Sequence, residues 1–194
     1  TACPSGMQYG ELLDIGRGLM EQQAPRPAVS RSLRALLRFV FSRWQLLKAL
    51  LALGRTVRPF LPRRLRSKIP LHQVSGPVPA AQHARKMLLL EGCVQRAATP
   101  NTNAAARRVL DKLGISLLSA APAGCCGALN YHLAAHADGL DNMRRNIDAW
   151  WPYLENGAEA IVSSASGCGA MLADYGRLLA ADPRYADKAR RVSD

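Results

Sequence analysis

The chain has 194 residues, 48% of them hydrophobic, and a formal net charge of +12. A chain of this size and composition can bury a full core, so disorder throughout is excluded and one globular domain with an appendage is expected. The five cysteines form an odd set without regular short spacing, and no secretory signal precedes them. A disulfide framework is therefore disfavoured. Reduced thiols in a cytoplasmic setting, used for metal binding, redox chemistry or burial, are expected instead.

The positive charge is concentrated in one segment. Residues 22–90 contain 14 Lys or Arg and no Asp or Glu. Such a segment suits nucleic acid, an acidic partner or an anionic membrane face, and the charge alone does not select among them.

The N-terminal sequence predicts a short helix. The stretch "SGMQYGELLDIGRGLMEQQ" carries a helical pattern that starts near Ser5. Pro25 and Pro27 in the following "APRP" break that pattern, because proline disrupts a helix interior. The helix is therefore expected to end before these prolines.

A longer amphipathic helix is expected next, over "SRSLRALLRFVFSRWQLLKALLALG". Arg38, Arg43 and Lys48 interrupt its apolar run, so it is not a transmembrane span. The favoured interpretation is an apolar stripe packed on the rest of the protein, and the alternative is a helix lying on a membrane surface. Residues 58–79 contain five prolines and a basic cluster, which predict an irregular linker.

The pattern changes after the linker. Three short apolar runs, "KMLLLEG", "ISLLSA" and "AIVSSAS", alternate with helical segments: "NTNAAARRVLDKLG", Ala128 to about Glu155 with a break near Gly139, and "GCGAMLADYGRLLA". Strands alternating with helices predict βαβ units and a mostly parallel sheet. The expected fold class is α/β, with a Rossmann-like parallel sheet preceded by a mainly helical basic connector.

Four cysteines follow the three predicted strands. Cys93 comes after the first strand, Cys125 and Cys126 after the second, and Cys168 after the third. Because an open parallel sheet gathers the carboxyl ends of its strands at one edge, these thiols are expected to meet. Each has a glycine close by, which permits close backbone approach to a bulky guest. Burial as a small hydrophobe is the alternative for any one cysteine, but it suits four equivalent positions poorly.

Four thiolates suit zinc or an iron-sulfur cluster. Zinc knuckles usually use two C-x2-C pairs, whereas here two adjacent thiols share one turn and the other two are distant in sequence. A guest with several metal atoms is therefore favoured, and a vicinal disulfide is the remaining alternative. His132 and His136 are spaced to bind metal on a helix, but a packing role is favoured for them.

The stretches "EGCVQ", "AGCCGALNYH" and "SASGCGAML" resemble, in order and spacing, one copy of the cysteine-rich CCG module. This module occurs in heterodisulfide reductase subunits, in lactate-utilisation iron-sulfur proteins and, closest in wording, in the iron-sulfur subunit of glycolate oxidase. The resemblance covers residues from about 85 to the end. It implies that the module's cysteines Cys93, Cys125, Cys126 and Cys168 are ligands of a 4Fe-4S cluster. The family pattern closes with C-x-x-C, and Met171 stands where the last cysteine would be.

The N-terminal "TACPSG" resembles the close of a bacterial ferredoxin run, in which the last cysteine precedes proline. The resemblance implies that Cys3 is a ligand of a ferredoxin-type cluster whose other thiols lie before Thr1. The chain is then expected to be a middle fragment. Its parts would be the end of a ferredoxin-type 4Fe-4S domain (1–24), a basic helical connector and linker (25–84) and the first CCG domain (85–194).

The resemblance implies an iron-sulfur electron-transfer subunit of a glycolate, or other 2-hydroxy acid, oxidase complex. In such an oxidoreductase a flavin-containing partner subunit oxidises the substrate, and electrons leave through 4Fe-4S clusters towards a membrane acceptor. The expected partners are flavin-containing oxidase subunits and, through the basic connector, a membrane surface, but no nucleic acid. The expected location is cytoplasmic and peripheral on the inner membrane. The alternatives are a heterodisulfide or thiol reductase subunit, in which the cluster meets the substrate, and a structural zinc module.

Overall fold

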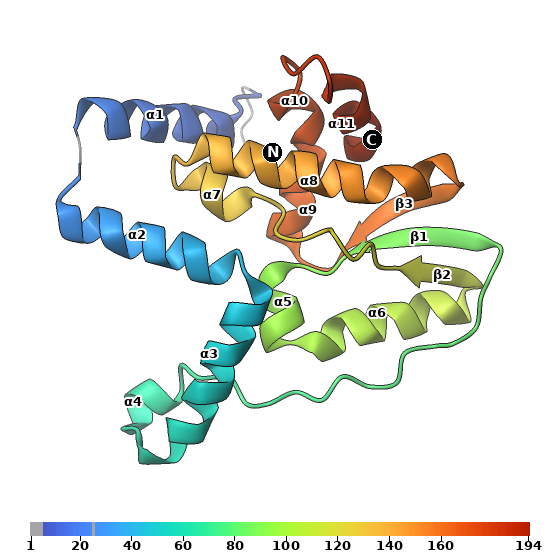
Figure 1. Ribbon diagram of the computed structural model, residues 1–194, viewed down its shortest axis with the longest axis horizontal. Helices are drawn as coiled ribbons and strands as arrows, with labels where there is room; N and C mark the ends of the chain where they lie inside the picture. Colours follow the sequence, from blue (N-terminus) through green and yellow to red (C-terminus); the bar gives the residue numbers. More distant parts are fainter. Residues whose placement is uncertain (1–5, 25) are drawn as a thin grey trace.

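The computed structural model describes residues 6–24 and 26–194, so Cys3 and Pro25 lie outside the described residues. The first part of the chain is helical and carries no strand among the residues described up to position 84 (Figure 1). Its elements are α1 (Tyr9–Gln23), α2 (Ala28–Phe41), α3 (Trp44–Val57), the 3₁₀ turn η1 (Arg58–Phe60) and α4 (Arg63–Arg66).

Strands and helices alternate in the second part, as the sequence predicts. This part therefore confirms the expected α/β class. Its elements are β1 (Arg85–Leu90), α5 (Cys93–Ala98), α6 (Pro100–Lys112), β2 (Ile115–Leu118), α7 (Ala128–His132), α8 (His136–Glu155), β3 (Ala158–Ser163), α9 (Ser166–Ala173), α10 (Tyr175–Leu178) and α11 (Ala186–Ser193).

The three strands form one parallel sheet in the order β2-β1-β3. The central strand β1 pairs Leu88 with Leu118 on one side and with Ile161 on the other. Figure 1 shows α6 on one side of the sheet and α8 on the other. The chain moves from β1 to β2 and then returns past β1 to β3, so its two crossovers run in opposite directions across the sheet. Because both crossovers are right-handed, their helices cover opposite faces. The carboxyl ends of β1 and β3 thus form a switch point, where such sheets bind ligands.

The core lies between the sheet and α8. Met143, Ile147 and Trp150 recur at helical spacing along α8 and are fully buried. Leu88 and Leu90 of β1 join the same cluster, since a central strand covered on both faces carries a continuous apolar run. The core therefore fixes α8 against the sheet and, with it, the loop that enters α7.

The prediction of one continuous helix over residues 30–54 is wrong, because the structure has two helices there. Arg43 leaves the helical conformation (φ −116°, ψ 95°), so α2 ends at Phe41 and α3 begins at Trp44. The bend lets α3 pack on α5 and bury Leu47. By contrast, no described residue of α2 is buried, so its apolar stripe stays at the surface within this chain.

A second break also differs from expectation. The segment from Ala128 to Glu155 is interrupted between His132 and His136, not at Gly139, which lies inside α8. Ala134, in the interruption, adopts a positive φ of 63°. At Gly139 an added Cβ would lie 3.0 Å from the Tyr131 side chain, so this glycine allows α7 to pack directly on α8.

Two further features of the helical part are relevant to function. The linker expected over residues 58–79 contains the short helical elements η1 and α4 and is otherwise irregular. Among the residues described, no helix combines the length and the apolar character needed to span a membrane.

Replacing Gly127 with Ala should destabilise the protein severely. Gly127 has φ +91°, and an added Cβ would lie 2.7 Å from the backbone oxygen of Gly139. We expect a loss in the free energy of unfolding greater than the roughly 1–2 kcal/mol of left-handed strain alone. Gly114→Ala is the matched control, because Gly114 has φ +72° but open space around it. Equal losses for the two variants in urea unfolding would contradict this account.

Candidate functional site

The four cysteines predicted to meet do lie together at the carboxyl ends of the strands. Cys93 begins α5 directly after β1, Cys125 and Cys126 precede α7, and Cys168 lies in the first turn of α9 after β3. The sulfurs of Cys93 and Cys125 are 3.8 Å apart. Cys126 lies close enough to Cys125 and Cys168 for these two thiols to be the main cause of its raised pKa. The thiols therefore form one connected group that draws on all three strand ends.

The thiols influence each other strongly because they are close and largely removed from water. Hydrogen bonds from the thiols of Cys126 and Cys93 lower the pKa of Cys125, and the Gly127 backbone N–H adds to the effect. The hydrogen bond with Cys126 likewise lowers the pKa of Cys168. The pKa of Cys93 and of Cys126 is raised, first by these same hydrogen bonds and then by burial. The pKa is therefore raised at two of the thiols and lowered at the other two.

These four thiols suit a cofactor that contains several metal atoms. Four neighbouring thiols cannot all ionise in a buried place without a cation, since like charges raise each other's pKa. A bound metal removes that repulsion, and thiolates are the ligands that iron-sulfur clusters use. Among the residues described, no three His, Cys, Asp or Glu side chains converge on a single point suited to one ion. The ligand role of Cys93, Cys125, Cys126 and Cys168 stays a prediction.

The side-chain amide of Asn146 holds the loop with the paired cysteines. It is fully buried in α8, donates to the Cys125 carbonyl at 2.9 Å and accepts from the Gly124 N–H at 2.8 Å. Its amide also donates to the Tyr175 hydroxyl at 3.1 Å, which in turn donates to the Cys126 carbonyl at 2.8 Å. The Asn146 amide, the Tyr175 hydroxyl and the two cysteine carbonyls are buried polar groups that need partners, and the Gly124 N–H is half-buried. The loop is therefore anchored from both α8 and α10.

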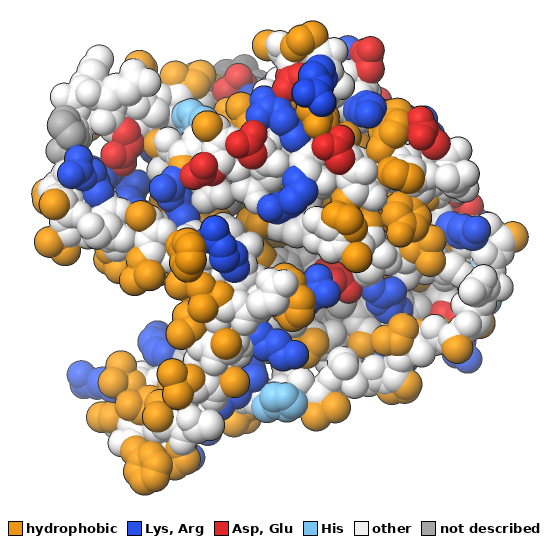
Figure 2. All heavy atoms as spheres, viewed as in Figure 1, with side chains coloured by type: hydrophobic (Ala, Val, Ile, Leu, Met, Phe, Trp, Pro, Cys, Tyr) orange, Lys and Arg blue, Asp and Glu red, His pale blue; other side chains and the backbone are white. Residues whose placement is uncertain are grey.

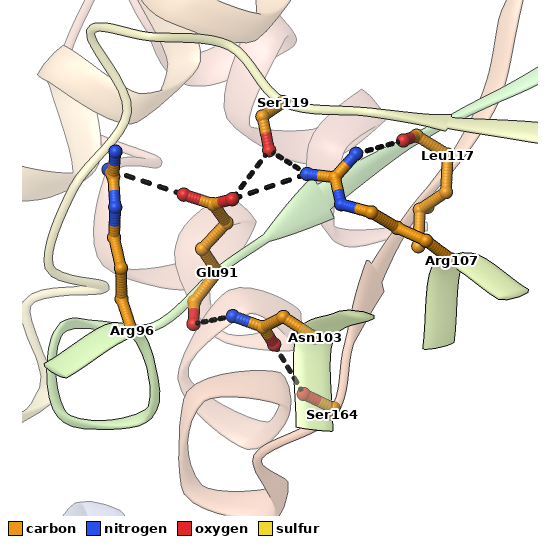
Figure 3. Close-up of polar contacts among 7 residues, drawn as sticks. All are labelled: Glu91, Arg96, Asn103, Arg107, Leu117, Ser119 and Ser164. Carbon is orange, nitrogen blue, oxygen red and sulfur yellow. Dashed lines mark hydrogen bonds and ion pairs between the residues drawn. The ribbon is translucent and has the colours of Figure 1, made fainter. Parts of the chain in front are cut away.

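A second network surrounds the end of β1 (Figure 3). The Glu91 carboxylate pairs with Arg96 and with Arg107, each at 3.2 Å. The Glu91 carbonyl accepts a hydrogen bond from the Asn103 amide at 2.7 Å. The Ser164 hydroxyl in turn donates to the side-chain oxygen of Asn103 at 3.1 Å. These contacts tie the residue two positions before Cys93 to α5, α6 and the turn after β3.

The connector also reaches this edge of the sheet. The bend between α2 and α3 places Ser42 and Trp44 in a small pocket that Cys93 and Cys125 also line. The Arg96 guanidinium lies 3.9 Å from the centre of the Trp44 ring, a cation–π distance that fastens the bend to α5. The connector is thus part of the wall around the thiols.

The remaining candidates lie elsewhere. Cys3 is outside the described residues. Met171, at the position of the absent cysteine, is buried in the core next to the thiols. His132 does not pair with His136 around a metal; it contacts the Asp14 carboxylate of α1 at 2.9 Å. The ring of His136 packs on Tyr131, as a packing role predicts.

Sequence reasoning missed the residues that support the thiols. Asn146 could have been noticed, because it is a polar residue between Met143 and Ile147 on the apolar face of α8. Ser42 and Trp44 offer no such signal, since their role depends on a bend within a continuous helical pattern.

Comparison with known proteins agrees with this geometry. Residues 87–173 match the family of the cysteine-rich domain, CCG. The matched segment includes all four clustered thiols, so this part of the chain is similar to the CCG cysteine-rich domain.

The whole chain is 53% identical to the glycolate oxidase iron-sulfur subunit of Escherichia coli strain K12, over 100% of this chain and 48% of that protein. It is 24% identical to the probable glycolate oxidase iron-sulfur subunit of Bacillus subtilis strain 168, over 96% of this chain and 47% of that protein. Lactate utilization protein A of the same strain is 28% identical over 56% of this chain and 44% of that protein. The chain therefore spans about half the length of its curated relatives. No solved structure matches it significantly.

Removal of the Asn146 amide should weaken the cysteine loop. Asn146→Ala removes the partner of the half-buried Gly124 N–H and of the buried Cys125 carbonyl, at up to about 1–3 kcal/mol each. We expect the free energy of unfolding to fall by about 3 kcal/mol or more in urea unfolding, by that cost per group. The control is Asn156→Ala, which removes an exposed amide contact and should change the free energy of unfolding by less than about 0.5 kcal/mol. A loss at Asn146 as small as that of the control would show that the amide does not hold the loop.

Proposed function

We propose that the chain is part of an iron-sulfur electron-transfer subunit of a glycolate, or other 2-hydroxy acid, oxidase complex. The observation that carries the proposal is the meeting of four thiols from three separate strand ends in a CCG cysteine-rich domain. The 53% identity to a glycolate oxidase iron-sulfur subunit supports the choice of complex. The oxidation of the substrate is assigned to a flavin-containing partner subunit.

In this proposal Cys93, Cys125, Cys126 and Cys168 hold a 4Fe-4S cluster, which supplies one-electron transfer when bound. The rest of the site controls the environment of the thiolates. Burial of the cysteine pair limits contact with water, and the Gly127 N–H donates towards the Cys125 sulfur. Both effects set the potential at which thiolate-bound iron accepts an electron. Cys3 is proposed to belong to a separate ferredoxin-type cluster.

We further propose that the connector lies on the membrane that holds the electron acceptor. Its helices expose large apolar side chains, and the segment has no acidic residue. In Figure 2 the surface over α3 and α4, at lower left, shows orange and blue side chains and no red ones. An apolar face with a basic rim favours the interface of an anionic membrane. The exposed apolar residues are Val29, Leu33, Leu36, Leu37, Phe39, Leu50, Leu53, Val57, Phe60 and Leu65.

Anaerobic reconstitution with iron and sulfide should load the CCG domain. We expect about four irons per chain, by the count of four thiolate ligands, together with visible charge-transfer absorption. Cys126→Ser should abolish most of the loading, because it removes the thiol that links Cys125 to Cys168. Iron content and the absorption spectrum measure the result.

The matched control is Cys3→Ser, which should leave iron loading unchanged. Equal loading of wild type, Cys126→Ser and Cys3→Ser would show that the paired cysteines are not ligands. Zinc bound in place of iron, without visible absorption, would favour a structural zinc module. Reduction of the loaded chain by a purified flavin partner separates electron transfer from a heterodisulfide or thiol reductase activity.

Binding to vesicles tests the membrane proposal. The chain should bind vesicles that contain phosphatidylglycerol, and the affinity should fall as salt rises, since exposed charges are screened over about 10 Å at 0.1 M. Combined replacement of Arg63, Arg64 and Arg66 with Ala should weaken binding roughly 100-fold, at about 1 kcal/mol per basic residue near the surface. Sedimentation with vesicles gives the affinity.

The control replaces three basic residues on the C-terminal side of the chain, Arg184, Lys188 and Arg190, which should not weaken vesicle binding. Equal effects of the two triple variants, or equal binding to neutral phosphatidylcholine vesicles, would contradict a specific role for the connector.

A further inference from the structure

The bend between α2 and α3 presents a hydroxyl group to the cysteine site. Ser42 lies at the end of α2 and lines the same pocket as Cys93 and Cys125, together with Trp44 and Gly124. Here the connector lines the same pocket as two of the thiols. The sequence around it is otherwise an uninterrupted helical pattern.

The Ser42 hydroxyl has no other use in the fold. Its oxygen is buried and has no hydrogen-bond partner within ordinary distance among the residues described. It does not cap a helix, since Ser42 closes α2 through its backbone N–H, which donates to the Arg38 carbonyl. A buried hydroxyl without a partner is costly, so such groups call for an explanation. Cys125 lines the same pocket, and the Ser42 hydroxyl is among the groups that lower the pKa of its thiol.

The bend is held firmly enough for a directed contact. Trp44 stacks on Arg96, which is paired with Glu91 at the end of β1. Leu47, one turn further along α3, is buried. Ser42 therefore lies between a fixed helix and the cysteine loop, on the wall of the pocket that Cys125 also lines.

We propose that Ser42 is a positioning residue of the metal site, which donates an O–H···S hydrogen bond to the Cys125 thiolate and raises the reduction potential of the cluster held there. The inference rests on the proposed iron-sulfur function. A hydrogen bond to a ligand sulfur withdraws electron density from it and so favours the reduced, more negative state of the cluster. The connector thereby tunes electron transfer as well as linking two parts of the chain.

The test measures the midpoint potential of the reconstituted full chain by a redox titration followed by electron paramagnetic resonance. Ser42→Ala should bind the same amount of iron as wild type and show a more negative midpoint potential. Ser42→Thr retains the hydroxyl and should restore the wild-type potential. Ser32→Ala, at an exposed position of α2, is the control and should leave the potential unchanged.

Threonine and valine have nearly the same shape, so Ser42→Thr and Ser42→Val form a second pair that differs mainly in the hydroxyl group. A more negative potential for Ser42→Val than for Ser42→Thr supports the hydrogen bond even where alanine disturbs packing. An unchanged potential in both Ser42→Ala and Ser42→Val would overturn the inference while the iron content upheld the proposed function. A wild-type chain that binds no iron would refute both.

Discussion

The buried amide of Asn146 fixes the loop that carries Cys125 and Cys126, and the candidate site depends on that loop. One side chain accepts from the Gly124 N–H and donates to the Cys125 carbonyl, so the backbone on both sides of the first thiol is held by α8. The loop has no strand partner to satisfy these groups. Because an unpaired buried amide or carbonyl is costly, the loop has little freedom to adopt another conformation. The two thiols can therefore meet those from the other strand ends.

The order of the strands explains why the thiols come from three distant points in the sequence. The central strand β1 delivers Cys93, and β3, its neighbour, delivers Cys168. Right-handed connections place α6 and α8 on opposite faces and leave the carboxyl edge between β1 and β3 open. A loop from β2 fills that edge with the paired cysteines. The same topology that builds a small α/β core thus creates a place for four soft ligands.

The connector combines two properties that belong to different surfaces of the molecule. Its inner side contacts the α/β part of the chain through Leu47 and through the stacking of Trp44 on Arg96. Its outer side carries exposed apolar residues in a segment without acidic ones. Since α2 buries none of its described residues, its amphipathic character is not explained by packing within this chain. The exposed apolar side of α2 is therefore suited to contact a surface outside this chain.

The sequence by itself determined the α/β class, the parallel sheet and the gathering of Cys93, Cys125, Cys126 and Cys168. These follow from local patterns, namely apolar runs, helical spacing and glycines at strand ends, together with a general rule about parallel sheets. Only the tertiary structure decided the break at Ser42 and Arg43 and the hydrogen bonds of Asn146. The helical pattern continues through residues 30–54, and the bend at Arg43 brings α3 against α5, a long-range packing that the local pattern does not contain. Long-range contacts of this kind join residues about 20 to 80 positions apart, and no local pattern encodes which of them meet.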